Sequence, residues 1–398
     1  MNLLFLCHKM AKGFGVSVVV DALSRQLAAY GHRVTIGCLE DDGHFAGLDI
    51  RLVDADPAAL RALAAQSGAE VVIAHTTPYF EALPALAGEF RCWAWEHGDP
   101  SPELFAAHGD SAERAAIAEH KRQHVYPHLQ GVIAISHFIR SDIGWPAANV
   151  IGNGADHVPE GEDAGFLPYA EQRPLRVGTL MRLGTGEAYY KGGEFFLKLA
   201  AEAAASGIDC RFAVMGRGEK SDAADFRQRG IDVHLNASDA ERSRFLQELD
   251  VFVSCSLWEG FNLPLVEAAR AGTACIAFDS GAHPEVTPLV VSDTHAALSL
   301  LRAYAGNRDL LARHSRLCAR HIQQQFRWET AALALMKLLG AVPQAGTAPA
   351  AVVPGALGRR WQSSLPRRLL ARAYDSWQRD GLWCTLARIR HYLRRRFS

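Results

Sequence analysis

The stretch VFVSCSLWEGFNLPLVEAARAGTACIAFD, residues 251–279, contains two short apolar runs on either side of a predicted helix. The runs at 251–256 and 274–279 have the length and composition of buried strands. Pro264 suits the first turn of a helix, and Gly272 suits the residue just past its end. A strand, a helix and a second strand in this order predict two parallel strands joined by a crossover, which is the unit of an α/β sheet.

The same alternation extends along most of the chain. Further apolar runs predict strands, mostly with helices between them: NLLFLCH, RVTIGCLE, DIRLVDA, EVVIAHT, RCWAWEH, GVIAIS, NVIGNG, LRVGTLM, CRFAVMG and IDVHLN. Residues 159–174 interrupt this rhythm with Gly, Pro and acidic residues, which is typical of a linker. The sequence therefore predicts two doubly wound α/β domains, residues 1–160 and 174–340, the second ending in a helix over 327–340.

The C-terminal part has a different composition. Residues 341–358 are rich in Ala, Pro and Gly, which predicts a flexible linker. Residues 359–398 hold eleven Arg and two Asp, so the net charge of −1 conceals an acidic body and a basic tail. Apolar residues recur in the tail at helical spacing: Leu382, Leu386, Ile389, Leu393 and Phe397. We expect a basic amphipathic helix that binds an anionic membrane surface or packs against the acidic body.

Composition excludes several other classes. No run of 18 apolar residues is present, and the opening segment lacks the cationic lead of a signal peptide. The eight cysteines are scattered without a C-x-x-C pair, which argues against a metal cage or a disulfide framework. The acidic body makes nucleic acid an unexpected partner. These features predict a cytoplasmic protein, with peripheral attachment to the inner face of a membrane if the tail binds lipid.

Two glycine-containing turns follow predicted strands. In KMAKGFGVSVVV, Gly13 and Gly15 fit the dinucleotide fingerprint, but Val18 stands in place of its third glycine. MGRGEK repeats the arrangement around Gly216. Neither turn is a P-loop, because G-x-x-x-x-G-K-[ST] is absent. Both remain compatible with an NAD(P) site, with the phosphate of another ligand, and with tight turns that bind nothing.

Two carboxylates frame the loop in the stretch quoted first. Glu259 lies in the loop and Glu267 in the expected first turn of the helix, with the amides of residues 261–263 directed out of the helix N-terminus. Amide donors beside carboxylate acceptors suit a ligand with hydroxyl and phosphate groups. The alternative is an ordinary amphipathic helix in which Glu267 only complements the helix dipole.

The Glu-x7-Glu spacing resembles the motif of the retaining glycosyltransferases of family 4, which have the GT-B architecture. Further segments match the pattern of that family in the same order: KGFGVSVVVDALSRQLAAYGH, WEHGDP, AISHFIRSDI, VIGNGAD, VGTLMRLGTGEAYYKGG, AVMGRGE and SCSLWEGFNLPLVEAARAGTACIAFDSGAHPEV, which contains the Glu-x7-Glu motif itself. The likeness covers residues 1–340. It implies an α/β fold of two Rossmann-like, doubly wound domains facing a cleft, to which this chain adds its basic helical tail.

The resemblance also implies roles for the matching residues around the donor. Glu267 would accept hydrogen bonds from the ribose hydroxyls of a nucleotide sugar, and Glu259 from hydroxyls of the donor sugar. The loop residues that would orient this sugar are Gly260, Phe261, Asn262 and Leu263.

The phosphate site follows from the same likeness. Arg182 and Lys191 would hold the diphosphate without a metal ion, because two fixed cations can stabilise the charge of a leaving nucleoside diphosphate. Their separation of nine residues is wider than is usual in the family, and Thr179 occupies the position where the arginine often stands.

Glycines and one histidine complete the expected site. Gly15 would let the backbone of the first domain approach the phosphate, and Gly13 and Gly216 would contribute to the donor site. His97, in WEHGDP, would lie near the reacting sugar as a catalytic group.

The resemblance predicts a hexosyltransferase that moves a sugar from a nucleotide-diphosphate sugar to a glycan hydroxyl with retention of the anomeric configuration. No cofactor and no metal are expected, and the two glutamates would bind substrate instead of acting as an acid–base pair. The tail favours a lipid-linked acceptor, as in bacterial polysaccharide or envelope glycan synthesis. The alternatives are a nucleotide-sugar epimerase of the same architecture and an NAD(P)-dependent oxidoreductase.

Overall fold

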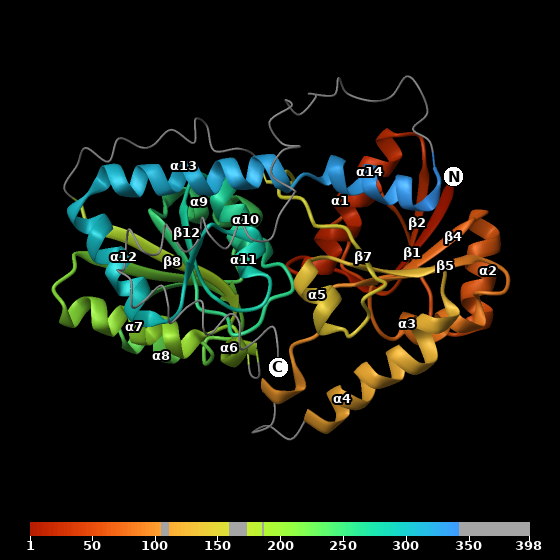
Figure 1. The fold of residues 1–398 in the computed structure, drawn as a ribbon, viewed down its shortest axis with the longest axis horizontal. Coiled ribbons are helices and arrows are strands. Elements are labelled where there is room, and N and C mark those ends of the chain that lie inside the picture. Colours follow the sequence, from red (N-terminus) through yellow and green to blue (C-terminus); the bar gives the residue numbers. More distant parts are fainter. Residues whose placement is uncertain (105–110, 159–172, 185–186, 342–398) are drawn as a thin grey trace. The chain divides into compact units, whose positions relative to one another are not determined.

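The computed structural model describes residues 1–104, 111–158, 173–184 and 187–341, and Figure 1 shows the arrangement of their elements. The first sheet is entirely parallel, with strand order β3-β2-β1-β4-β5-β6-β7. Its strands are β1 (Asn2–Met10), β2 (Arg33–Asp41), β3 (Asp49–Leu52), β4 (Val71–Ala74), β5 (Arg91–Glu96), β6 (Gly131–Ala134) and β7 (Asn149–Val150). Its helices are α1 (Gly15–Ala29), α2 (Pro57–Ser67), α3 (Tyr79–Ala82), α4 (Ser111–His120) and α5 (His137–Asp142).

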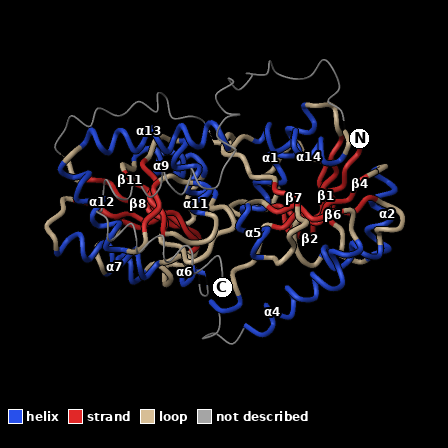
Figure 2. The backbone as a smooth tube through the Cα atoms, viewed as in Figure 1, coloured by secondary structure: helices blue, strands red, loops and turns tan. Residues whose placement is uncertain are grey.

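The second sheet is also entirely parallel, in the order β10-β9-β8-β11-β12-β13. Its strands are β8 (Leu175–Arg182), β9 (Cys210–Arg217), β10 (Asp232–Leu235), β11 (Val251–Ser254), β12 (Ala274–Phe278) and β13 (Leu289–Val291). The helices that follow β8 are α6 (Glu187–Tyr190), α7 (Gly193–Ala205), α8 (Ala224–Gln228), α9 (Asp239–Glu248), α10 (Leu263–Arg270), α11 (His283–Val286), α12 (Thr294–Gly306), α13 (Arg308–Gln325) and α14 (Trp328–Leu339). Figure 2 colours the strands of both sheets red and the helices around them blue.

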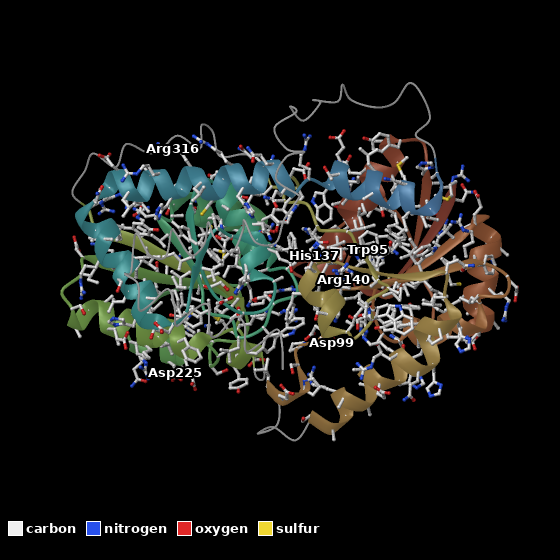
Figure 3. All side chains as sticks on the ribbon, in the orientation of Figure 1. Trp95, Asp99, His137, Arg140, Asp225 and Arg316 are labelled. Carbon is white, nitrogen blue, oxygen red and sulfur yellow. The ribbon has the colours of Figure 1, made fainter. Side chains whose placement is uncertain are left out.

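Burial explains why the strands read as continuous apolar runs. Each sheet is parallel and carries helices connecting its strands, so the inner strands are buried on both faces, whereas the edge strands β3 and β10 have no buried residue. The four residues of β4 and the five of β12 are all buried. Trp95 of β5 lies in the core of the first domain, whereas Asp225 and Arg316 project from the second (Figure 3). The prediction of two Rossmann-like domains is confirmed. The short strand β13 was not among the predicted strands.

The last helix corrects the predicted domain plan. α14 was expected to end the second domain, but it packs against α1 of the first. The Tyr30 hydroxyl donates to Glu329 Oε1 at 3.1 Å, and Arg91 Nη2 donates to the carbonyl oxygen of Leu339 at 3.0 Å. The apolar face of α14 thus completes the core of the first domain, which its periodicity alone could not indicate. Most of the predicted linker at 159–174, all but the first residue of the predicted linker at 341–358, and the whole predicted tail at 359–398 lie outside the described residues.

Candidate active site

Helix α10, which lies between strands β11 and β12, has Asn262 as its N-cap. Asn262 has a left-handed backbone with φ of 71°, and its side-chain oxygen accepts a hydrogen bond from the backbone N–H of Leu265 at 3.2 Å. Pro264 lies in the first turn and Gly272, with φ of 91°, follows the helix end, as the sequence predicts. Glu267 lies in the second turn, so its predicted place in the first is wrong, because the helix begins one residue before the proline.

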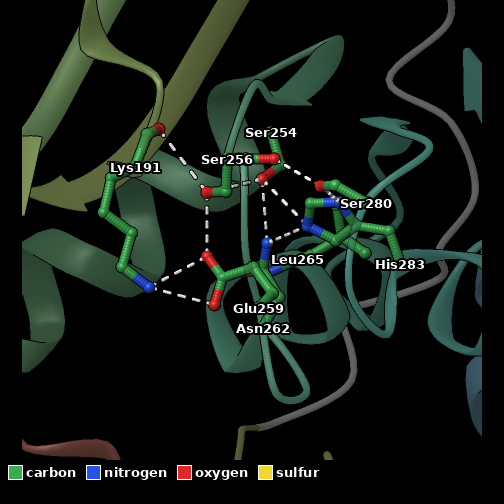
Figure 4. A network of polar contacts seen from close by, with 8 residues as sticks. All are labelled: Lys191, Ser254, Ser256, Glu259, Asn262, Leu265, Ser280 and His283. Atoms are coloured by element: carbon green, nitrogen blue, oxygen red, sulfur yellow. Dashed lines mark hydrogen bonds and ion pairs between the residues drawn. The ribbon is translucent and has the colours of Figure 1, made fainter. Parts of the chain in front are cut away.

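Glu259 and Lys191 form an ion pair beside the start of α10 (Figure 4). Lys191 Nζ lies 2.9 Å from Glu259 Oε1 and 3.0 Å from Oε2, and Ser256 Oγ donates to Oε1 at 2.8 Å. The side chain of Glu259 is 9% exposed. Charge-assisted hydrogen bonds in such a sheltered place are strong, so the pair fixes the orientation of both side chains.

The buried side chain of His283 holds Asn262, and with it the loop before α10, in place. The Asn262 side-chain amide donates to Ser254 Oγ at 2.9 Å and to His283 Nε2 at 2.8 Å. His283 Nδ1 lies 2.8 Å from the carbonyl oxygen of Phe278. Burial lowers the pKa of His283, and in the neutral ring Nδ1–H donates to Phe278 while Nε2 accepts from the amide. This assignment leaves the Asn262 oxygen free to cap α10.

Three glycines allow these segments to pack closely. A Cβ atom at each would lie within 3.0 Å of a carbonyl oxygen: Gly192 against Cys255, Gly281 against Glu259, and Gly260 against His97. Gly260 therefore lets the second-domain loop touch the backbone of the predicted catalytic His97, and Gly192 lets the segment that carries Lys191 approach the residue that follows β11.

We expect Gly192→Ala to destabilise the protein more than Gly43→Ala. Both glycines have left-handed backbones, with φ of 76° and 75°, so each alanine adds a strain of about 1–2 kcal/mol. A Cβ at position 43 meets nothing within 4 Å, whereas at position 192 it meets the Cys255 carbonyl. The overlap should lower the free energy of unfolding by about 1–3 kcal/mol more at position 192. Urea denaturation measures both, and equal losses would contradict the close approach.

Glu267 is 1% exposed and holds two partners. His157 Nε2 lies 2.9 Å from Glu267 Oε1, and Arg242 Nη1 lies 3.2 Å from each carboxylate oxygen. The contact between Arg242 and Oε1 has hydrogen-bond geometry. Among the described residues, Oε2 is left buried without a hydrogen-bond partner.

The glycine loop of the first domain lies near other predicted site residues. The guanidinium of Arg182 is 5.5 Å from the ring centre of Phe14. Gly13 precedes that ring with φ of 77°, and Gly15 begins α1. A Cβ at Gly15 would lie 3.5 Å from the side chain of Leu263, in ordinary contact. The structure thus brings Gly13, Gly15, Arg182 and Leu263 into one neighbourhood.

Packing explains two predicted donor-binding residues without a ligand. Gly216 lies within β9, where a Cβ would press on the carbonyl oxygen of Met181 in the neighbouring strand. The buried ring of Phe261 packs edge-on against Phe326, with ring centres 5.2 Å apart.

His97 follows β5 and lines a cavity of about 420 Å³ in the first domain. The cavity is lined by residues at the carboxyl ends of β1, β4 and β5, and strand order reverses between β1 and β4, the usual ligand position of such sheets. His97 Nε2 lies 3.1 Å from His75 Nδ1. Burial lowers the pKa of His97 to about 3, so its ring is neutral at physiological pH.

The wall of this cavity contains a charged cluster that the sequence did not reveal. Lys121 Nζ lies 2.9 Å from Glu96 Oε1 and 3.4 Å from Asp99 Oδ2, and the Tyr126 hydroxyl donates to Glu96 Oε1 at 2.6 Å. Burial acts to lower the pKa of Lys121, but the charges of Glu96 and Asp99 outweigh it and raise that pKa above its usual value. A lysine in a helical segment carries no pattern that marks it as buried.

Other members of the site were also missed. His157 directly follows the quoted segment VIGNGAD, and Ser256 stands three residues before Glu259, so both lay next to recognised motifs. His283 in α11 lies within the recognised segment 254–286 but was given no role, and Arg242 in α9 had no such signal.

Comparisons with known proteins point to glycosyltransferases. A family model described as Glycosyltransferase Family 4 matches residues 15–158, and one described as Glycosyl transferases group 1 matches residues 177–304. A phosphatidyl-myo-inositol mannosyltransferase from Mycolicibacterium smegmatis is 30% identical over 166 residues, which cover 39% of this chain and 41% of that relative. The chain thus matches less than half of the relative's length.

Solved structures show the same fold at low sequence identity. Sucrose-phosphate synthase from Thermosynechococcus elongatus has a TM-score of 0.69 and 17% identity, covering 85% of this chain and 98% of that one. HepE from Anabaena, solved with UDP and glucose, has a TM-score of 0.67 and 16% identity, covering 86% and 100%. The catalytic domain of starch synthase IV from Arabidopsis thaliana, bound to ADP and acarbose, has a TM-score of 0.62 and 14% identity, covering 85% and 98%. With glycosyltransferase models matching both domains and neighbours of this fold, the chain belongs to the GT4-type glycosyltransferases.

Proposed function

We propose that this protein transfers a sugar from a nucleotide-diphosphate sugar to a glycan hydroxyl and retains the anomeric configuration. The observation that carries the proposal is the Lys191–Glu259 ion pair beside α10. It sets a cation suited to a diphosphate next to a carboxylate suited to sugar hydroxyls. Glu267 would bind the ribose hydroxyls, and Arg182 would complete the phosphate site.

In this mechanism the carboxylates bind and do not attack. Glu259 already accepts hydrogen bonds from Lys191 and Ser256, and Glu96 is itself ion-paired, so neither resembles the free nucleophile of a double displacement. The leaving diphosphate would accept the proton of the attacking hydroxyl on the same face of the sugar, while Lys191 stabilises its charge. The neutral His97 would offer a hydrogen bond to the sugar.

The relatives favour this function over the two alternatives. Both family models describe glycosyltransferases, not epimerases or NAD(P)-dependent oxidoreductases. Two structural neighbours were solved with UDP or ADP together with a sugar, which supports a nucleotide sugar as the donor.

Thermal unfolding with a panel of nucleotide sugars tests the proposal. A ligand at 100 times its dissociation constant adds about 2.7 kcal/mol to stability, so the correct UDP-, GDP- or ADP-sugar should raise Tm clearly above the others. The stabilised pair is then assayed for transfer to a glycan. A rise in Tm with NAD(P) and with none of the sugars would favour the oxidoreductase.

We expect transfer to continue in excess chelator. Lys191 and Arg182 supply the positive charge that a divalent ion would otherwise supply to the diphosphate. The measurement is the initial rate with and without EDTA, using Lys191→Met as a control in which the protein cation is removed. Full loss in EDTA, restored by a divalent cation, would contradict the assignment of the phosphate site.

We further propose that the acceptor is lipid-linked, in bacterial polysaccharide or envelope glycan synthesis. One relative is named a phosphatidyl-myo-inositol mannosyltransferase, and the sequence predicts a basic amphipathic tail over 359–398. Among the described residues no helix is both long and apolar enough to cross a membrane. The tail would hold the enzyme peripherally on the cytoplasmic face of the membrane.

Sedimentation with anionic liposomes tests the tail. Each Arg near an anionic surface contributes about 1 kcal/mol of attraction, which salt screens. The full chain should sediment at low salt and be released as salt rises, whereas a chain ending at Gly358 should stay in solution and still bind the nucleotide sugar. Neutral liposomes serve as the control. If the full chain ignores anionic liposomes at low salt, the tail is a packing element.

A further inference from the structure

The chain passes between its two domains twice, and both passages lie side by side. The segment after β7 leads out of the first domain, and the turn between α13 and α14 leads back to it. The backbone N–H of Ala155 donates to the carbonyl of Phe326 at 3.0 Å, and that of Trp328 donates to Asp156 Oδ1 at 2.8 Å. A Cβ at Gly154 would overlap the Trp328 backbone. We call residues 154–158 and 326–328 the double crossover.

The double crossover is bonded directly to α10, the helix that carries Glu267. Arg270 Nε donates to the carbonyl oxygen of Val158 at 2.6 Å, and Phe326 packs edge-on against Phe261. His157 Nε2 lies 2.9 Å from Glu267 Oε1. The second glutamate of the motif is therefore held by the segment that connects the domains.

A tryptophan fixes which nitrogen of His157 carries the proton. The indole Nε1–H of Trp328 lies 3.1 Å from His157 Nδ1, and an indole can only donate. His157 Nδ1 must accept this bond, so Nε2 carries the hydrogen and donates to Glu267 Oε1. Trp328 thus donates to His157, and His157 donates to the Glu267 carboxylate. Hydrogen bonds between histidine and carboxylate fix the tautomer and the ring orientation of metal-binding histidines in the same way.

This arrangement leaves one carboxylate oxygen for a ligand. Oε1 accepts from both His157 and Arg242, while Oε2 is buried and has no hydrogen-bond partner among the described residues. Arg242 Nη1 lies equally far, at 3.2 Å, from the two oxygens. Without His157 the carboxylate could rotate so that Oε2 accepts the hydrogen bond from Arg242 and is no longer available to a ligand.

We propose that His157 is a positioning residue for donor binding. Held in one tautomer by Trp328, it donates to Glu267 Oε1 and leaves the buried Oε2 without a hydrogen bond from the described residues, so that Oε2 can accept one from a ribose hydroxyl of the nucleotide. The inference rests on the proposed function in one respect, that Glu267 binds the nucleotide. A histidine that served only to fill space would have no need of the indole bond.

Measurements of nucleotide binding separate a positioning role of His157 from a role in which its ring only fills space. Kd values for UDP, GDP and ADP are measured by calorimetry on the full chain and its variants. His157→Leu should weaken the tightest of these nucleotides about tenfold, because one charge-assisted bond to Glu267 is lost. His157→Gln should stay within about twofold of the parent, because its amide N–H stands where Nε2–H stood. The control is His314→Leu, another half-buried histidine, bonded to the Tyr304 hydroxyl and expected to leave Kd unchanged.

The tautomer is observed directly by NMR of ¹⁵N-histidine protein. The His157 signals, assigned by their loss in His157→Gln, should report a protonated Nε2 and an unprotonated Nδ1. Trp328→Phe keeps an aromatic ring but removes the donor, so the Nδ1 signal should shift as its hydrogen bond is lost, while Nε2 stays protonated because it still faces Glu267 Oε1. A protonated Nδ1 in the parent protein would overturn the proposal.

The results of these experiments distinguish a failure of this inference from a failure of the proposed function. If Glu267→Gln binds nucleotide as well as the parent, the assignment of Glu267 is wrong and His157 has no positioning role. If Glu267→Gln weakens binding while His157→Leu does not, the proposed function stands and the inference fails. Equal weakening by Leu and Gln at position 157, with unchanged Tm, also overturns it.

Discussion

Replacing Lys121 with Met should lower the free energy of unfolding by about 3–5 kcal/mol, the range for removing one partner of a buried ion pair. Lys121 is 4% exposed and Glu96 1% exposed. Methionine has nearly the volume of lysine, so the loss arises mainly because the Glu96 carboxylate stays buried without its cation. Urea unfolding at pH 7 measures the change.

The pH range of this measurement follows from the pKa of Lys121. The folded-state pKa lies above the unfolded value, because the charges of Glu96 and Asp99 outweigh burial. The contribution of Lys121 is therefore fully present below the unfolded pKa and is lost only as the pH rises through the folded pKa. The difference between variant and parent should thus be constant around pH 7 and shrink in strong alkali.

Two variants separate charge from packing. Adding Glu96→Gln to Lys121→Met should recover part of the stability, because no buried charge then remains unpaired in this cluster. The matched surface change is Arg61→Met, whose ion pair with Glu89 is largely exposed and should contribute at most about 1 kcal/mol. Equal losses of unfolding free energy in Lys121→Met and Arg61→Met would show that the buried ion pair contributes no more stability than the exposed one.

Much of the fold could be predicted because parallel strands are buried on both faces. Continuous apolar runs such as 71–74 and 274–278 are the signature of that burial. Strand β13 escaped because three residues are too few for periodicity to register. Helix α14 was assigned to the wrong domain because its apolar stripe shows that it is buried but not against which sheet.

The candidate site could also be predicted only in part. Glu259 and Asn262 stand three residues apart just before α10, so the local backbone positions them together, whereas Lys191 meets Glu259 across 68 residues. His157 and Arg242 meet Glu267 across sequence separations of 110 and 25 residues. Such contacts depend on the packing of whole elements, which no spacing rule in one sequence encodes.

Glu259→Gln and Lys191→Met should each reduce turnover about 10- to 150-fold, the effect of losing a charge-assisted hydrogen bond in the transition state. The double variant should lose little more than either single one. In the structure each side chain fixes the other at 2.9–3.0 Å, so removing one partner already releases the second. Residues in contact depart from additivity in this way, and a double-mutant cycle measures the coupling.

The matched control for this cycle is Ser256→Ala. It removes a single neutral donor from Glu259 Oε1 and leaves the ion pair in place, so turnover should fall only about 2- to 10-fold. Circular dichroism and Tm confirm that each variant is folded. Fully additive losses in the cycle would mean that Lys191 and Glu259 act on different parts of the donor without holding each other. Turnover near the parent value in Glu259→Gln would remove the carboxylate of the EGFNLPLVE loop from the reaction altogether.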